Sequence, residues 1–408
     1  VREGFIRYGL SAADIKKKIH EFKPDVVGVG GMHSNRVYEV QDVLEAVKAV
    51  SGGIITVVGG GYASMHPEHC LSSPNCDYVV LGEGEYTARD LLRRIDQKKD
   101  ISDLDGFGYK IKGKFRINPK TVNIPNLDEI PFPAYHLLKM KDYFNIRMPG
   151  SRYEMRNYSL FCGSRGCPHK CSYCAKALIV GEGYRKRSIS NMIEEITLLK
   201  NDFKVEEIRF VDYHTMADVK HWKAFCRALV DQKIGIRFID PHGFAVNALN
   251  GELIELMHEA GCDHLYISIE SGDQEFLSRL SKRVDLGKVE GIIRKSHELD
   301  MPVTGYFIIG LPGQTWKEIA ATVEYAKSLD LDDVDFFIAN PFPGTDIYGE
   351  CEEKRLMYPD FDFQRIRYSL NNIKGPDYTR EMIESVRRDA WFEIMTRNMR
   401  KGKIRIRR

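Results

Sequence analysis

The sequence predicts an α/β protein built from two successive runs of alternating strands and helices. Short apolar runs alternate with amphipathic segments over residues 12–95 and again over residues 158–339. Such alternation is typical of parallel sheets whose faces are covered by helices. A proline-rich segment with Pro125, Pro131 and Pro133 separates the two runs. We therefore expect an N-terminal domain over 1–124, a linker over 125–155, a second domain over 156–350 and a helical region over 351–408.

The first run predicts three buried strands, each followed by glycine-rich backbone. Ser11 has the side chain of a helix N-cap before the helical pattern of residues 12–22. The strands are predicted at 26–29, 54–58 and 78–81, and the helices at 37–50, 69–71 and 87–95. Ligands of open α/β sheets bind beyond the carboxyl ends of the strands, where glycines allow close approach. Three such segments in equivalent positions favour a ligand site over ordinary turns.

The second run has the element lengths of a full or partial βα barrel. A hairpin is expected after residue 107, before the linker. Strands are predicted at 208–212, 237–240, 264–269, 303–309 and 335–339. Helices are predicted at 188–199, 222–232, 251–260, 274–280, 286–299 and 316–328. From residue 359 onwards we expect mostly helix.

Composition narrows the class of protein. Apolar residues make up 43%, enough for sizeable cores, and 60 basic residues nearly balance 58 acidic ones. This balance gives no electrostatic reason to expect a nucleic-acid or membrane partner, and the basic segment 397–408 is expected to be a solvated end. No apolar run approaches the roughly 20 residues of a membrane span, and no signal pattern opens the chain, so we expect a cytoplasmic protein. The chain starts at Val1, which suggests missing upstream residues or an unusual start codon.

Four of the nine cysteines crowd into a short segment that predicts a metal centre. Cys167, Cys171 and Cys174 are separated by three and then two residues, so one loop can aim all three thiolates at one cluster. Cys162 lies upstream of a glycine-bracketed turn, and we expect it not to be a ligand. A zinc site is the alternative, but His169 lies between two ligands, where its geometry is poor. The other cysteines are expected to be buried side chains.

This spacing, with Tyr173 just before the last cysteine, resembles the signature of the radical SAM superfamily. Segments 261–272, 305–313 and 341–345 resemble other conserved strand ends of that family. The resemblance implies a [4Fe–4S] cluster with one open iron, which chelates S-adenosylmethionine (SAM) and reduces it to a 5′-deoxyadenosyl radical. It also implies a set of SAM-binding residues: Tyr173, Asp212, Ser268, Glu270, Ile309 and Gly310.

The first domain and the barrel together resemble the cobalamin-dependent radical SAM enzymes. This resemblance implies a Rossmann-like cobalamin-binding domain, followed by a radical SAM partial (β/α)6 barrel and a C-terminal helical segment. The Asp-x-His-x-x-Gly loop of many other cobalamin proteins is absent. The implied cobalamin-binding residues follow the three strands: Met32, His33, Ser34, Gly59, Gly60, Gly61, Tyr62, Gly82, Glu83, Gly84 and Glu85. His33 could also approach the lower face of cobalt, although a loop histidine bonded locally is the plainer interpretation.

The most common activity of this class is the transfer of a methyl group from methylcobalamin to an unactivated carbon, as in radical SAM C-methyltransferases. Tyr213 and Tyr306 are expected to be catalytic or substrate-facing, and Tyr153 and Tyr184 are further candidates, with ordinary packing as the alternative. The resemblance leaves the substrate open between a peptide or protein residue and a small molecule. It also implies an electron donor of ferredoxin or flavodoxin type. The alternative activity is a cobalamin-dependent radical SAM cyclase or rearranging enzyme; a methylthiotransferase is disfavoured because a second cysteine triad is absent. A cobalamin sensor with a structural cluster is a further alternative.

Overall fold

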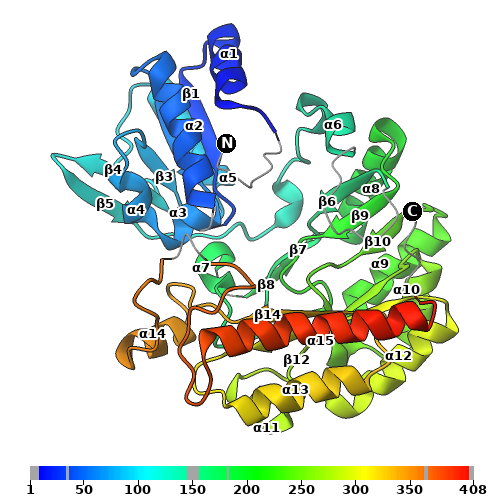
Figure 1. Cartoon of the computed structure of the whole chain (residues 1–408). Helices are drawn as coiled ribbons and strands as arrows, with labels where there is room; N and C mark the ends of the chain where they lie inside the picture. Colours follow the sequence, from blue (N-terminus) through cyan, green and yellow to red (C-terminus); the bar gives the residue numbers. More distant parts are fainter. Residues whose placement is uncertain (1–8, 34–35, 145–155, 182, 363–365, 404–408) are drawn as a thin grey trace. The chain divides into compact units, whose positions relative to one another are not determined.

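The structure is a computed structural model that describes residues 9–33, 36–144, 156–181, 183–362 and 366–403. The chain divides into two compact units (Figure 1). We call the first, formed by 1–124 with 177–181 and 361–366, the N-terminal unit. The second, formed by 125–176, 182–360 and 367–408, is the barrel unit. Among the described residues, no helix combines the length and apolar character needed to cross a bilayer.

The N-terminal unit is a five-stranded sheet of order β1-β2-β3-β4-β5. The first three strands are parallel, as predicted, and β4 and β5 form the expected antiparallel hairpin. The strands are β1 (Val26–Gly30), β2 (Ile55–Gly59), β3 (Tyr78–Val80), β4 (Phe107–Ile111) and β5 (Lys114–Asn118). The helices are α1 (Ala12–Phe22), α2 (Val37–Val50), α3 (Gly61–Met65), α4 (Pro67–Ser72) and α5 (Glu85–Asp96). Ser11 caps α1 in a capping box, as expected.

Alternation along the strands covers both faces of this sheet. Val58 and Val79 pack against α2 and α4, whereas Val57 and Val80 pack against Leu91 of α5. Successive strand residues point to opposite faces, so the same strands supply both cores. The carboxyl ends of β1, β2 and β3 therefore share one edge, where the three glycine-rich segments begin.

In the described part of the barrel unit, seven parallel strands form two sheets, β10-β9-β6 and β11-β12-β13-β14. A parallel bridge between Phe238 and Cys262 links the end of the first sheet to the second. The main strands are β6 (Tyr158–Phe161), β9 (Glu207–Phe210), β10 (Arg237–Ile239), β12 (Leu265–Glu270), β13 (Val303–Ile309) and β14 (Asp333–Ile338). The short ones are β7 (Ser164–Gly166), β8 (Tyr184–Lys186) and β11 (Phe244–Ala245).

Helices cover the outer face of these strands. Phe161, Phe210, Phe238 and Phe307 are fully buried between strands and helices in the largest core cluster. The longer helices are α8 (Ile189–Phe203), α9 (Val219–Asp231), α10 (Gly251–Glu259), α12 (Val289–Glu298), α13 (Trp316–Ser328) and α15 (Arg380–Arg400). The shorter helices of the barrel unit are α6 (Met140–Phe144), α11 (Gln274–Arg279), α14 (Asp346–Glu353) and the 3-10 helices η2 (Leu127–Glu129), η3 (Tyr135–Leu137), η4 (Val246–Ala248) and η5 (Leu286–Lys288). The helix α7 (Lys176–Val180) belongs, from residue 177 onwards, to the N-terminal unit.

The end of the chain differs from the helical region expected over 351–408. After α14 the described chain runs without a helix until Arg380, and a bridge pairs Met357 with Ile373. Pro359 and Pro376 lie in this stretch and lack the N–H that a helix interior needs. The final helix, α15, then packs on β14, where Arg387 Nε donates to the Phe336 carbonyl at 2.7 Å.

Candidate functional site

The three clustered cysteines lie on the loop that joins β7 to α7. All three are free thiols and partly exposed. Lys176 stabilises this loop, because its Nζ donates to the Cys167 carbonyl at 2.8 Å and also to the His169 carbonyl. Burial, followed by the neighbouring thiols, raises the pKa of Cys174, and burial also raises that of Cys171. The thiols are therefore close enough to interact, and metal binding here must release their protons.

A partly buried ion pair lies against this loop. Lys282 Nζ binds Glu270 Oε1 at 2.8 Å, and Tyr173 Oη donates to the same oxygen at 3.2 Å. Burial opposes the charge of Lys282, but Glu270 and then the thiols of Cys171 and Cys167 raise its pKa. Glu270 has a φ of 69° at an irregularity in the pairing of β12 with β13. Such backbone strain is found where a side chain must be aimed at a functional site.

The three thiols of this loop fit a cluster that is bound by three protein sulfurs. The fourth nearby thiol, Cys162, lies directly after β6 and donates to the Ser164 carbonyl at 3.2 Å. The His169 ring stacks on His214 at a centroid distance of 5.2 Å. Within the described ranges, no three His, Cys, Asp or Glu side chains are arranged around a single metal ion. Three soft thiolates on one loop suit iron–sulfur ligation, in which each iron takes one protein sulfur.

The structure brings only some of the predicted SAM-binding residues near the loop. Glu270 and Tyr173 contact each other there, and Ser268 lies two residues earlier on β12, with its Oγ donating to the His242 carbonyl at 3.1 Å. Ile309, in contrast, is fully buried in the large core cluster. Gly310 follows it in a turn with φ 79°, where its N–H donates to Gln314 Oε1 at 2.7 Å.

Asp212 is buried behind the cluster loop, where it holds the turn that precedes the loop. Its carboxylate accepts a hydrogen bond from the Gly163 N–H at 3.0 Å and one from Ser164 Oγ at 2.5 Å. The side chain is 2% exposed, and burial raises its pKa to about 7, against the opposing effect of these hydrogen bonds. Asp212 therefore positions the start of the loop from the interior.

Asp212→Asn is expected to stabilise the fold at high pH only. A folded pKa above the unfolded value of 3.8 means that folding favours the protonated carboxyl. This contribution is complete below about pH 4 and is lost as the pH rises to about 7. The neutral amide keeps most of the hydrogen bonding, so we expect a gain on the order of 2 kcal/mol at pH 8 and none at pH 4. Urea unfolding at both pH values measures it; an equal effect at the two would contradict the burial argument.

Aromatic side chains line the inner face of the barrel strands. Tyr266, Tyr306, Phe337 and Ile239 form one cluster, and Tyr306 Oη donates to the Pro241 carbonyl at 2.9 Å. Further apolar or aromatic side chains of the barrel unit are open to solvent: Leu160 (57% exposed), Tyr368 (57%) and Tyr213 (42%). Tyr184 lies on β8 beside the cluster loop, and Tyr153 is outside the described residues.

The carboxyl ends of β1, β2 and β3 form a second site, in the N-terminal unit. Met32 is 69% exposed, His33 is also exposed, and Ser34 is outside the described residues. A side chain at Gly59 would meet nothing closer than 3.8 Å. The edge therefore has no side-chain bulk at Gly59 and exposes the apolar Met32. Such a surface can accommodate a broad, flat ring such as a corrin.

Several predicted cobalamin-binding residues have structural roles at this edge. A side chain at Gly60 or Gly61 would collide with the backbone of Gly31 or Met32, at 2.8 and 2.5 Å. The Tyr62 side chain is fully buried and its Oη bonds His69 Nδ1 at 2.6 Å.

The third glycine-rich segment leads into α5. Glu83 is 4% exposed, and its Oε2 accepts from the Ile124 N–H at 2.8 Å. Gly82 turns with φ 61°, Gly84 is the N-cap of α5, and Glu85 is its exposed first residue. The Glu83 side chain is thus held inside the unit, whereas Glu85 lies at its surface.

Sequence reasoning missed three basic residues at the cluster loop: Lys176, Lys282 and Arg283. Lys176 follows Cys174 by two residues, so its position in the motif was the available signal. The other two follow a short helix in a charged stretch, and nothing in that stretch predicts that Lys282 packs against the cluster loop.

Comparison with known proteins agrees with this arrangement. Residues 5–92 match the B12 binding domain family, and residues 162–326 match the radical SAM superfamily. The chain is 31% identical over 402 residues to cytidylyl-2-hydroxyethylphosphonate methyltransferase of Streptomyces wedmorensis, covering 91% of this chain and 75% of the relative. It is 30% identical to an uncharacterized methyltransferase of Pyrococcus horikoshii, covering 95% and 82%.

A solved structure shares the fold. The radical S-adenosylmethionine methyltransferase TsrM of Kitasatospora setae, with cobalamin and a [4Fe–4S] cluster bound, superposes with a TM-score of 0.69 at 18% identity, over 84% of this chain and 67% of that one. The fold class predicted from the sequence is thereby confirmed. The thiolate loop, the open sheet edge and these relatives lead to one conclusion: the chain belongs to the cobalamin-dependent radical SAM methyltransferases, which use a [4Fe–4S] cluster, S-adenosylmethionine and cobalamin.

Proposed function

We propose that this methyltransferase moves a methyl group from cobalamin to an unactivated carbon of a small molecule. The bound cofactors would supply the chemistry: a 5′-deoxyadenosyl radical removes a hydrogen atom from the substrate, and the substrate radical takes the methyl group. The observation that carries the proposal is the aromatic inner face formed by Tyr266, Tyr306 and Phe337. A carbon radical needs neither a nucleophilic acceptor nor a base, so an apolar wall suits it better than a polar one.

The open side chains near this wall support a substrate site in the barrel unit. Leu160 lies on β6 between the buried Ser159 and Phe161, so it points to the inner side of the strands, yet it is 57% exposed. An exposed leucine inside a barrel indicates that side chains do not fill the interior there. Tyr213, at 42% exposure, follows β9 and is a candidate to contact the substrate.

The relatives bear on the substrate class. The Streptomyces relative is named for a small molecule, cytidylyl-2-hydroxyethylphosphonate, and this supports a small molecule over a peptide or protein residue.

The cluster also needs one electron for each radical that it generates. We therefore propose an external one-electron donor of ferredoxin or flavodoxin type as the partner.

Anaerobic reconstitution tests the methyl-transfer proposal. The full chain, loaded with iron, sulfide and cobalamin, is supplied with SAM bearing a labelled methyl group, a reductant and a candidate substrate. We expect 5′-deoxyadenosine and S-adenosylhomocysteine in equal amounts, and the label on a carbon of the product. Formation of 5′-deoxyadenosine without S-adenosylhomocysteine would contradict methyl transfer and favour a cyclase. Label on oxygen or nitrogen would contradict an unactivated carbon acceptor.

A further inference from the structure

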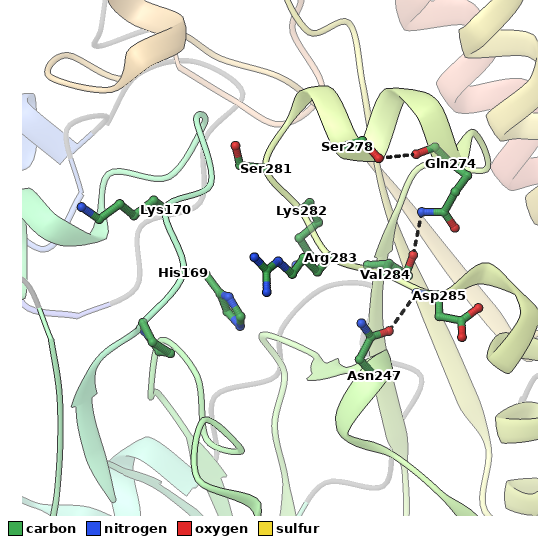
Figure 2. A pocket seen from close by; sticks show the side chains of 11 residues that line it. His169, Lys170, Asn247, Gln274, Ser278, Ser281, Lys282, Arg283, Val284 and Asp285 are labelled. Carbon is green, nitrogen blue, oxygen red and sulfur yellow. Dashed lines mark hydrogen bonds between the residues drawn. The ribbon is translucent and has the colours of Figure 1, made fainter.

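A hollow lies between the cluster loop and the turn that follows α11. Its volume is about 990 Å³, which is at the upper end of the range for small-molecule sites. Figure 2 shows His169 on one side and Lys282 and Arg283 on the other, with Gln274 and Asn247 at the margin. The complete lining is Pro168, His169, Lys170, Asn247, Gln274, Ser278, Ser281, Lys282, Arg283, Val284 and Asp285.

The charge of this hollow is predominantly positive. Lys170, Lys282 and Arg283 line it, and Asp285 is the only acidic side chain among the described lining residues. Asp285 is already engaged, because its Oδ1 accepts from the Gly287 N–H at 3.0 Å. Lys282 and Arg283 are adjacent in the chain and line the hollow together with Lys170, so their positive charges repel one another, a cost that a bound anion would remove.

Arg283 differs from its neighbour Lys282 in its partners. Lys282 is partly buried and paired with Glu270, whereas Arg283 is exposed and has no acidic side chain at ion-pair distance within the described part of the chain. Figure 2 shows the Arg283 guanidinium directed across the hollow toward His169. A guanidinium offers a planar set of N–H donors that matches phosphate and carboxylate oxygens in pairs.

We propose that this hollow binds a phosphate or phosphonate group of the substrate, with Arg283 as the principal contact. The proposal rests on the proposed function in one respect, namely that the substrate is a small molecule. A doubly charged group with three oxygens can engage Arg283, Lys170 and the hydroxyl of Ser281 together, whereas a carboxylate has only two oxygens. The abundance of positive charge therefore favours a phosphate-type dianion over a carboxylate.

Binding of two simple probes to the anaerobically reconstituted full chain tests this site. Isothermal titration with methylphosphonate and with inorganic phosphate should give saturable binding, with acetate at least about tenfold weaker. Arg283→Gln should weaken phosphonate binding about tenfold, since a hydrogen bond to a charged group is worth roughly one decade in affinity. The phosphonate affinity of Arg283→Lys should lie between those of the wild type and Arg283→Gln, because lysine keeps the charge but loses the paired donors.

A matched control variant removes one positive charge at a position outside the hollow. Arg294 lies exposed on α12 and does not line the hollow, so Arg294→Gln should leave the affinity within about twofold of the wild type. Equal affinities for Arg283→Gln and the wild type, or no saturable binding of either probe, would overturn the proposal. So would a variant that weakens SAM binding but not phosphonate binding, because the hollow would then serve the cofactor. The assay for methyl transfer uses the wild-type chain, so each proposal can fail alone.

Discussion

Replacing Cys174 with alanine is expected to abolish formation of 5′-deoxyadenosine, with a loss of at least about a thousandfold. Two thiolates cannot hold a four-iron cube that needs three protein sulfurs, and without the cluster no electron reaches SAM. The same result is expected for Cys167→Ala and Cys171→Ala, because the three thiols share one loop and interact electrostatically. Iron and sulfide content per chain, the cluster absorbance and the rate of 5′-deoxyadenosine release measure the effect.

Cys162→Ala is the matched control for the three ligand variants. Its thiol lies before the cluster loop and donates to the Ser164 carbonyl at 3.2 Å, so its removal costs one weak hydrogen bond and a little packing. We expect iron content and 5′-deoxyadenosine formation close to those of the wild type. Loss of the cluster in Cys162→Ala, with retention in Cys174→Ala, would show that other thiols bind the cluster.

The strands and their order along the chain were predictable because each carries its own apolar signal. The runs at 26–29 and 303–309 were placed to within a residue, since both are almost continuously apolar. The predicted burial was correct for β13 but wrong for β1, which lies at the end of the described sheet and is only partly buried. The cysteine loop was predictable for a similar reason: its spacing is local and needs no knowledge of the fold. Element ends were less certain; η5 and α12, for example, appear as one helix in the sequence pattern.

The direction of single side chains could not be predicted from the same patterns. Asp212 and Ile309 follow or end barrel strands, as ligand-binding residues often do, yet their side chains point into buried space. Tyr62 follows three glycines at an open sheet edge, and its ring nevertheless enters the core while its hydroxyl bonds His69. For Asp212 the hydrogen-bond partners come from a distant segment, so no local signal exists.

The electrostatics of the cluster loop were hidden for the same reason. Lys282 lies more than 100 residues after Cys174 in the sequence, and only the fold places its ammonium beside Glu270 and the thiols. The strained φ of Glu270 is likewise a consequence of the irregular pairing of β12 with β13. Long-range ion pairs of this kind are properties of the assembled barrel, and a motif of three cysteines does not report them.

Gly166→Ala is expected to destabilise the barrel unit by at least about 3 kcal/mol and to prevent stable cluster binding. Gly166 is the last residue of β7 and has a φ of 84°, which a residue with a side chain rarely adopts. An added Cβ would also lie 2.0 Å from the Gly183 carbonyl oxygen on the paired segment. The pairing of Gly166 with Tyr184 must then open, and Cys167, the next residue, moves with it.

The comparison with Gly183→Ala separates the collision from the backbone strain. Gly183 has a similar φ of 89°, but a side chain there would meet no atom within 4 Å. That variant therefore carries only the strain of the left-handed conformation, about 1–2 kcal/mol, and should keep its cluster. Melting temperature of the apo chain and iron content after reconstitution measure both variants. Equal melting temperatures and iron contents for the two variants would contradict this prediction. They would show that the pairing of β7 with β8 does not position Cys167. The hydrogen bond from the Lys176 ammonium to the Cys167 carbonyl would then be enough to shape the loop.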